Sequence, residues 1–597
     1  MYYLVRIVKY FKLGPYELGA LAIIALALVL RGVLIGLGWP LLDSDEGTMG
    51  LMAMHIAFRG EYPLFFYGQG YMGSTEAYLA AVMFHFFGVS SFTLRFGLLL
   101  LFAIFLIAVY LLTSLLYTKR LALVTLLFLA LGSNQQLIRE LVAVGGDPET
   151  LVAGTIVFLL AAWLALTSGQ EMVGERRWRR LLAYGGWGFA AGFGLWSHLL
   201  VAPFILLGSL LLLFFCWREL WSLACVCLLV GLAIGGAPLI YYNLNAPGGR
   251  TTLFYGINAI TAGGAVRVPT FLEQVKGALL VSLPTATGAG PLCPVQDVHF
   301  VSLNGLHGLH CTLVHTGWSA GIIVLWGIAT ALTLRGLWRY RASIRSWTLD
   351  ERRSVILYSA RLALLINGAI PLGLYILSPN SALYPVATSR YLIGLLVSTP
   401  AILWPLYEAA VGLKPLALRF SSRVANTLTR ISAVVGRGVL LLIGAVLLLG
   451  MFSTFTGIPA VPLDPHQDVY YTQINEQQHL DVPVVQSLNR QEDTLINYLL
   501  RSGARHIYSD YWTCDRLIFQ SQERIICSAV KDRLEPGHNR YQPYHDIVAA
   551  DPHAAYVFHT NSLSDVTFAQ RMASSDNGGQ KYQRLVLAGY VIYQPKE

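Results

Sequence analysis

Charged residues are scarce in this chain. Only 13% of its 597 residues are Asp, Glu, Lys or Arg, whereas 55% are hydrophobic, and soluble globular proteins carry roughly 25% charged residues. This shortage excludes an ordinary soluble protein and predicts a polytopic α-helical membrane protein. The net charge of +9 does not indicate a nucleic-acid partner, because the basic residues lie in short segments between apolar runs and form no DNA- or RNA-binding motif.

The sequence shows neither a cleavable signal peptide nor an internal repeat. Its first apolar run has the length of a membrane-spanning helix and is too long for a signal h-region. About eleven such runs approach the roughly 20 residues that cross a bilayer, and we expect a helix in each. They lie near residues 19–40, 92–116, 121–138, 150–167, 182–197, 199–217, 220–242, 314–335, 354–377, 391–411 and 438–456.

Lys and Arg are distributed unevenly between the loops. If the N-terminal segment with Arg6 and Lys9 is cytoplasmic, every loop rich in Lys and Arg lies inside, and the short outside loops contain very few. The positive-inside rule therefore predicts an integral cell-membrane protein with its N-terminus in the cytoplasm. The extracytoplasmic segments are then residues 41–92, 139–150, 243–313 and everything after about 455.

This pattern predicts two domains. Residues 1–456 form the membrane domain, and its first outside loop, residues 43–91, contains two amphipathic helices that we expect on or partly in the membrane surface. These helices end at Gly60 and Gly88, which are suited to the position after a helix. Residues 457–597 are more polar and long enough for a small extracytoplasmic α/β domain. Its expected helix is 491–503, and its expected strands lie within 504–512, 522–530, 554–560 and 587–594.

Seven cysteines divide between the predicted compartments. Three lie in predicted spans and are interpreted as small buried apolar side chains: Cys216, Cys225 and Cys227. The other four lie in predicted extracytoplasmic segments, where the environment is oxidising. They predict the disulfides Cys293–Cys311 and Cys514–Cys527, with free thiols as the alternative.

Three acids follow the first predicted span. The stretch DSDEG contains Asp43, Asp45 and Glu46, and carboxylates beside a bilayer are costly unless they face water or take part in chemistry. On the predicted topology they face the outside. A structural role is the alternative, because Asp43 is suited to cap the next helix and first-turn acids stabilise a helix dipole.

These residues carry a resemblance to a known family. The layout resembles the GT-C superfamily of integral membrane glycosyltransferases, and is closest to the branch of protein O-mannosyltransferases and the lipid A aminoarabinose transferase. That branch opens its first outside loop with an Asp-Glu element, matched by DSDEG, and has surface helices and a glycine before the second span, matched by FFGVSSFTLRFG. GGDPET loosely matches a second acidic element, and SRYLIGLLVSTP resembles an Arg-Tyr element that opens a late span.

The resemblance implies transfer of a sugar from a polyprenyl-phosphate donor to an extracytoplasmic protein, lipid or envelope glycan. A carboxylate would take the proton of the acceptor hydroxyl, and a cation would stabilise the leaving phosphate. We expect Asp45 as the general base and Glu46 as its helper. The expected donor contacts are Arg390, Tyr391 and His198, and the expected second acidic or acceptor site comprises Asp147, Glu149, Gln69 and Glu76.

Ordinary structural roles are the alternatives for these residues. Arg390 is also suited to anchor a span at the interface, His198 to be a buried hydrogen-bonded histidine, and GGDPE to form an ordinary turn before a helix. Glu76 and Gln69 are guesses from their position on the second surface helix and its approach.

No cofactor is expected, because the O-mannosyl and aminoarabinose branches are regarded as metal-independent. The alternative is Mg²⁺ or Mn²⁺ at Asp43, Asp45 and Asp147, since oligosaccharyltransferases of the same superfamily use a divalent ion. The motif HGLHCTLVH matches no standard zinc spacing, although it combines one cysteine with three histidines: Cys311 with His307, His310 and His315.

Two other classes of function stay open. A transporter or flippase for lipid-linked glycans should place ionisable groups near the bilayer midplane, whereas the acids here gather at one face. A non-catalytic scaffold that displays the C-terminal domain is compatible with the spans, but it leaves Asp45 and Glu46 unexplained.

Overall fold

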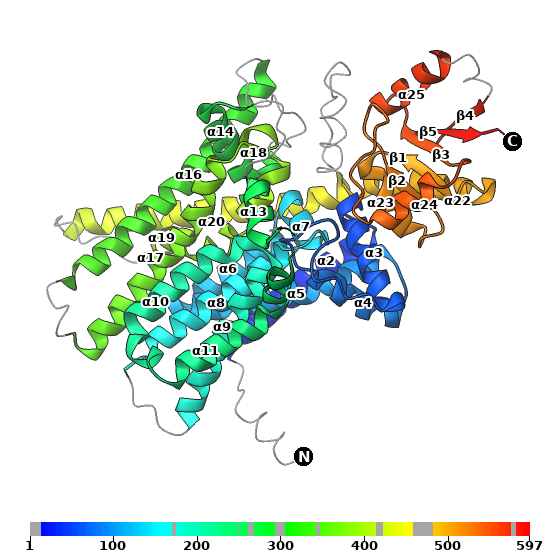
Figure 1. Ribbon diagram of the computed structural model, residues 1–597. Coiled ribbons are helices and arrows are strands. Elements are labelled where there is room, and N and C mark those ends of the chain that lie inside the picture. The colour runs from blue at the N-terminus through cyan, green and yellow to red at the C-terminus, as the bar shows by residue number, and fades with distance from the viewer. Residues whose placement is uncertain are drawn as a thin grey trace.

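The computed structural model shows a long helical part with a small mixed domain at one end (Figure 1). The structure describes residues 14–169, 175–246, 248, 250–260, 268–292, 305–341, 347–412, 422–457, 481–574 and 581–596.

Seven helical segments among the described residues are long and apolar enough to cross a membrane, or nine if each of two bent pairs is one span. The seven segments are formed by α2 (Pro15–Gly36), α5 (Ser91–Leu116), α8 (Asp147–Leu166), η1 with α10 (Leu199–Val201, Ala202–Leu220), α16 (Gly305–Trp338), α17 (Leu349–Ile376) and α20 (Ser422–Thr456). The bent pairs are α6 with α7 (Lys119–Leu131, Asn134–Leu141) and α11 with α12 (Leu223–Gly235, Ala237–Asn245). The membrane-protein prediction is confirmed, but the count of eleven spans is not, because α9 (Glu175–Ser197) and α19 (Leu395–Val411) fall outside this set.

The predicted span 121–138 differs most from its expected form. It consists of α6 and α7, which meet at an angle of 85°. Gly132 ends α6 with a φ of 70°, and Ser133 opens α7 with a capping box. A left-handed glycine followed by a new N-cap cannot continue a helix, so α7 turns away and carries Arg139 toward the first outside loop.

The predicted first outside loop folds into two helices, as expected. Asp43 caps α3 (Ser44–Arg59) by accepting the N–H of Glu46, and Gly60 ends it in the left-handed region. The second helix, α4 (Thr75–Phe87), ends at Gly88. α3 is buried along most of its length because the C-terminal domain covers it, so it is an interior helix at the junction of the two parts.

The predicted outside loop 243–313 and the segment before α19 contribute short helices. These are α13 (Thr252–Ile260), α14 (Phe271–Lys276), η3 (Gly277–Ser282), α15 (Leu283–Thr287), η4 (Gly290–Leu292), α18 (Asn380–Leu383) and η6 (Ala387–Leu392). A hydrogen bond connects this layer to α7, since Arg139 donates to the carbonyl of Ala387 at 2.9 Å.

The C-terminal domain is built on one five-stranded sheet of order β2-β1-β3-β5-β4. β1 lies between β2 and β3 and is parallel to both, whereas β5 is antiparallel to β3 and β4. The strands are β1 (His506–Ser509), β2 (Ile526–Ala529), β3 (Ala555–His559), β4 (Tyr582–Leu587) and β5 (Tyr590–Pro595). The helices are α22 (Val482–Ser502), α23 (Tyr511–Gln520), α24 (Gln542–Ala549) and α25 (Leu563–Ser574).

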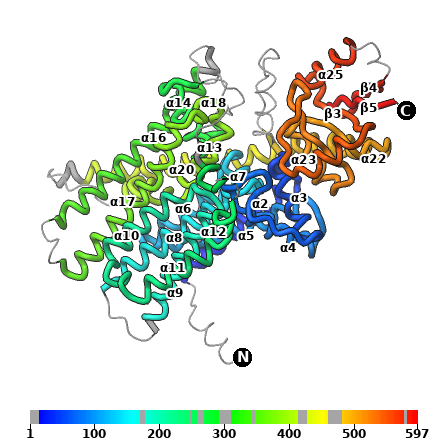
Figure 2. Tube along the Cα trace, viewed as in Figure 1, coloured from blue at the N-terminus to red at the C-terminus, as the bar shows by residue number. Residues whose placement is uncertain are grey.

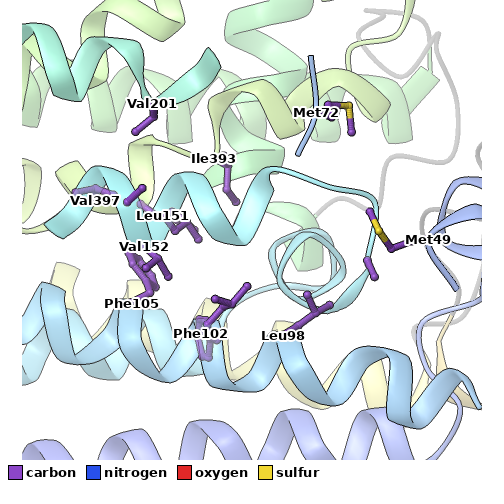
Figure 3. Close-up of a cluster of buried hydrophobic side chains, with 14 of the residues drawn as sticks. Met49, Met72, Leu98, Phe102, Phe105, Leu151, Val152, Val201, Ile393 and Val397 are labelled. Carbon is purple, nitrogen blue, oxygen red and sulfur yellow. The ribbon is translucent and has the colours of Figure 1, made fainter. Parts of the chain in front are cut away.

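One apolar core runs through the helical part and continues into the C-terminal domain. Side chains of α5 and α8 point toward one another at its centre, and Met49 of α3 lies at one side (Figure 3). The chain trace shows α3, in blue, beside α23, in orange, although they are far apart in sequence (Figure 2). The core therefore extends from the membrane helices to α3 and fixes this helix between the two parts.

The disulfide prediction is confirmed for one pair. Cys514 and Cys527 are bonded, with their Cα atoms 5.2 Å apart, and connect α23 to β2. Cys311 is also disulfide-bonded, but Cys293, its predicted partner, lies outside the described residues.

Membrane orientation stays a prediction, and fusions test it. We expect a reporter that is active only outside the cytoplasm to be active after Glu597 and silent after Arg180, because the Lys and Arg asymmetry places these positions on opposite sides. The enzymatic activity of the reporter in intact cells is the measurement. The reverse pattern would contradict the topology and move the acidic loop to the cytoplasmic side.

Candidate active site

Asp45 lies at the junction of α3 and the C-terminal domain. Its Oδ1 accepts a hydrogen bond from Nη2 of Arg540 at 2.7 Å and another from the hydroxyl of Tyr511. Burial opposes ionisation of Asp45, but the charge of Arg540 and these hydrogen bonds outweigh it and hold the pKa of Asp45 below its usual range. Asp45 is therefore ionised at neutral pH, and its Oδ2 has no hydrogen-bond partner among the described residues.

Asp43 has the opposite electrostatic behaviour. It accepts the Glu46 N–H at 2.8 Å and so performs the capping role that its position suggests. Burial and the neighbouring charges of Asp45 and Glu46 raise the pKa of Asp43 to about 7. Asp43 is therefore only partly ionised at neutral pH, whereas Asp45 is ionised.

Glu46 is fully buried in an ion pair. Its two oxygens accept hydrogen bonds from Nε and Nη2 of Arg95 at 2.7 and 2.5 Å, and both side chains are at most 1% exposed. Oε1 also accepts the N–H of Ala143 at 3.2 Å. These contacts connect α3 to α5 and to the loop before α8, and they indicate a structural role for Glu46.

The loop 143–146 rests on three buried acids. Besides Glu46, Glu76 accepts the N–H of Gly145 at 3.0 Å and Glu149 accepts the N–H of Gly146 at 3.1 Å. Burial and the adjacent carboxyl group of Glu149 raise the pKa of Glu76 well above its usual range. Glu76 is therefore protonated and is suited to donate to Glu149. The acids expected at an acceptor site thus fix the backbone that leads into α8.

Asp147 begins α8 beside two arginines. It is 1% exposed, and neither of its side-chain oxygens has a hydrogen-bond partner among the described residues. Arg139 of α7 and Arg390 of η6 are its attractive electrostatic neighbours. Nε of Arg139 is also unpaired within the described part of the chain. Unpaired buried groups of opposite charge indicate a place for a polar ligand.

Arg390 connects the parts of the site. It interacts electrostatically with Asp45 and Asp147, and these charges raise its pKa although burial opposes them. Among the residues that the structure describes, it donates no hydrogen bond, so its guanidinium is available to an anion. Tyr391 follows it in η6 and lies beside Tyr375, with ring centroids 6.5 Å apart.

His198 and Gln69 lie at the edge of this cluster. Burial and the nearby charge of Arg390 lower the pKa of His198 to about 3, so the ring is neutral. Its Nδ1 accepts the N–H of Leu200 at 3.1 Å. Gln69 is half-buried in the loop between α3 and α4. The expected roles of both residues stay predictions.

Metal binding gains no geometric support. Within the described residues, no group of three His, Cys, Asp or Glu side chains is arranged to hold a metal ion. The three acids of the metal alternative, Asp43, Asp45 and Asp147, are among the described residues and do not form such a group. In the histidine motif, His315 is buried and its Nδ1 lies 2.9 Å from the carbonyl oxygen of Leu280. The side chain of His307 is outside the described part.

An apolar cavity of about 100 Å³ lies near α7. It is lined mainly by apolar side chains of α6, α16, α19 and α20, and Gln136 reaches it from α7. Gln136 and Arg139 are three residues apart on one helix and therefore lie on neighbouring positions of its surface. α7 thus connects an apolar cavity to the charged cluster around Asp147.

Four residues of the cluster were missed by the sequence reasoning: Arg95, Arg139, Tyr511 and Arg540. The glycine and the capping box before α7 could have predicted the turn that places Arg139 in the cluster. For Tyr511 and Arg540 we find no signal, because they come from a different domain.

Comparison with known proteins supplies the fold. No protein-family model matches the chain, and no curated protein matches it in sequence. ArnT from Cupriavidus metallidurans bound to undecaprenyl phosphate matches in structure with a TM-score of 0.52 at 13% identity, over 96% of this chain and 97% of that one. The apo state of the same protein matches with a TM-score of 0.50, the same identity and the same coverage.

The apo oligosaccharyltransferase from Archaeoglobus fulgidus is a weaker match, with a TM-score of 0.46 at 14% identity over 96% of this chain and 73% of that one. The match to ArnT, a GT-C protein, extends over nearly the whole of both chains. A match of this extent is not limited to the membrane-spanning helices. The chain therefore has the GT-C fold that its acidic loop and its layout predict.

Proposed function

We propose that this protein is a membrane glycosyltransferase that moves a sugar from a polyprenyl-phosphate donor to an acceptor hydroxyl outside the cytoplasm. The observation that carries the proposal is that Asp45, whose Oδ2 has no hydrogen-bond partner among the described residues, interacts electrostatically with Arg390, whose guanidinium donates no hydrogen bond to any described residue. A base and a phosphate-binding cation at one place are what this transfer requires.

The class of donor is proposed from the chemistry of the groups beside α7. Arg139 and Arg390 offer guanidinium donors to a phosphate, and the apolar cavity beside Gln136 is suited to part of a hydrocarbon chain. The ArnT structure that shares the fold contains undecaprenyl phosphate, which supports a lipid of this class. The oxygens of Asp147 have no hydrogen-bond partner within the described part of the chain and can accept one from a hydroxyl of the sugar or of the acceptor.

The transfer itself is a substitution at the anomeric carbon. The acceptor oxygen forms a bond to this carbon while its proton passes to Oδ2 of Asp45. The bond between the anomeric carbon and the phosphate oxygen breaks, and its electron pair stays on the phosphate. Arg390, with Arg139 behind it, stabilises the negative charge that develops there. Glu46, which is fully paired with Arg95, acts as a positioning residue for the helix that carries Asp45.

Cells with and without the protein test the proposal. Loss of the protein should remove one glycan or glycoprotein species from the cell envelope and let the unused lipid-linked sugar accumulate, and mass spectrometry measures both. Washed membranes of the deletion strain then contain donor and unmodified acceptor. Added purified protein should form the missing product and release polyprenyl phosphate. An unchanged envelope and no accumulated donor would overturn the proposal.

Donor binding should depend on the two arginines. We expect Arg390→Ala to weaken binding of undecaprenyl phosphate by about tenfold or more, because a charge-assisted contact contributes roughly 1.5–3 kcal/mol. Arg139→Ala should have a similar effect, and calorimetric titration in detergent is the measurement. Arg59→Ala, a surface arginine of α3, is the control. Equal affinity of the Arg390 variant and the control would place the phosphate elsewhere.

A further inference from the structure

The C-terminal domain contacts the proposed general base directly. Asp45 receives hydrogen bonds from Arg540 and Tyr511 on the same oxygen, Oδ1. Nε of Arg540 also donates to the hydroxyl oxygen of Tyr511 at 2.7 Å. The three groups therefore form a closed triangle in which two members belong to a different domain from the base.

The sheet topology explains why these two residues lie together. Tyr511 begins α23 directly after β1, and Arg540 lies in the connection between β2 and α24. Since β1 and β2 are parallel neighbours, their carboxyl ends meet at one edge of the sheet. In open α/β sheets this edge is where ligands bind. Here the same edge faces the N-terminal turn of α3.

The docking of this edge on α3 is close and specific. A Cβ atom at Gly47 would lie 2.6 Å from the backbone carbonyl of Asp515, and one at Gly50 would lie 2.5 Å from the ring of Phe519. Only glycine permits such an approach of a helix to its neighbour. Thr48 donates to Asp515 at 2.6 Å on the same face. The first turns of α3 are therefore shaped to receive α23.

Arg540 is also held from the membrane domain. Its guanidinium carbon lies 4.7 Å from the ring centroid of Phe66, in the loop between α3 and α4. Gly68 of the same loop approaches the backbone of Arg540, where a Cβ would lie 3.5 Å from its Cα. The Arg540 side chain is only 9% exposed. These contacts fix the guanidinium in one place, as a positioning role requires.

We propose that the C-terminal domain completes the active site, with Tyr511 and Arg540 as positioning residues that hold Asp45 ready for the acceptor; this inference rests on the proposed function. Both bonds occupy Oδ1 and leave Oδ2 without a hydrogen-bond partner among the described residues. They also stabilise the ionised form of Asp45, which is the form that takes a proton. The other groups that face Asp45 are Asp43, Tyr71, Arg390, Asp515 and His538.

The acid limb of the pH–rate profile tests the inference. Arg540→Gln removes a cation and Tyr511→Phe removes a hydroxyl donor, so each should raise the pKa of Asp45. Because the base must be ionised, the acid limb should move to higher pH, by about 1 unit or more for Arg540→Gln. Arg540→Lys keeps the charge and should restore most of the wild-type profile. Product formation in membranes of the deletion strain is measured from about pH 2.5 to about pH 9, because the wild-type limb lies below the usual range of an Asp carboxyl group.

A docking contact at the other end of α3 provides the matched control. Arg59 forms an ion pair with Glu523 of the C-terminal domain, about 21 Å from Asp45 at 1.5 Å per helical residue. Arg59→Ala should reduce docking without moving the acid limb. If Arg540→Gln and Tyr511→Phe leave the limb in place, or if Arg59→Ala moves it equally, the positioning role is overturned.

Asp45→Asn separates this inference from the function on which it rests. If Asp45→Asn is inactive and the acid limb of the pH–rate profile is unmoved in the Tyr511 and Arg540 variants, only the inference is overturned. Near-normal activity of Asp45→Asn overturns both the assignment of the base and the inference. Loss of activity in Asp45→Asn with a moved limb in Arg540→Gln supports both.

Discussion

Replacing Asp45 by Asn should lower turnover by about 10²–10⁴-fold, the usual contribution of a general base. The amide keeps the shape of the side chain and still accepts the hydrogen bonds of Arg540 and Tyr511, but it cannot take a proton. Donor affinity should therefore change far less than turnover. Product formation in the deletion-strain membranes gives the rate, and titration with undecaprenyl phosphate gives the affinity.

Asp43→Asn is the matched control for this loss. It makes the same acid-to-amide change two residues earlier, and Asn caps a helix as well as Asp does. We expect a far smaller loss, since Asp43 caps α3 and its removal leaves Asp45 ionised. Near-normal turnover of a folded Asp45→Asn protein would show that the base is elsewhere. Asp147, with its two unpaired oxygens, is the next candidate.

The largest loss of stability is expected from Glu46→Leu. This change leaves the guanidinium of Arg95 buried without its counterion, and breaking a buried pair in this way typically costs about 3–5 kcal/mol. It also leaves the N–H of Ala143 without its acceptor. Titration of the micelle-bound protein with a denaturing detergent measures the change in the free energy of unfolding.

The double variant Glu46→Leu with Arg95→Met isolates the pair. Replacing both charges by apolar side chains should recover much of the loss, because neither ion is then buried alone. Glu17→Ala breaks the exposed pair of Glu17 with Lys119 and should change stability far less, since exposed pairs are screened by water. A double variant as unstable as the sum of the two single ones would contradict the ion-pair explanation.

Local signals were enough to predict the first outside loop. The cap at Asp43 and the glycines at positions 60 and 88 set the ends of α3 and α4 where they were expected. The disulfide between Cys514 and Cys527 was predicted because both cysteines lie in the same predicted compartment. These features depend on residues close in sequence or on topology, which a single sequence contains.

Pairings between distant elements were not predictable in this way. Arg95 belongs to an apolar run, and nothing local indicates that Glu46 is its partner. The burial of α3 depends on a domain encoded at the far end of the chain, so its apolar face was assigned to the membrane surface. β4 was missed because none of its side chains is buried and exposed ones lie on both faces, which leaves no clear alternation of apolar residues.

The order of residues along the chain has a consequence for biosynthesis. Membrane helices and their loops are made first, so Asp45, Arg139 and Arg390 are in place while the segment with Tyr511 and Arg540 is still being synthesised. On the proposed function, a growing chain would bind a lipid-linked sugar before its base is positioned. Transfer would begin only after the C-terminal domain has docked on α3, so the order of synthesis would delay the reaction until the site is complete.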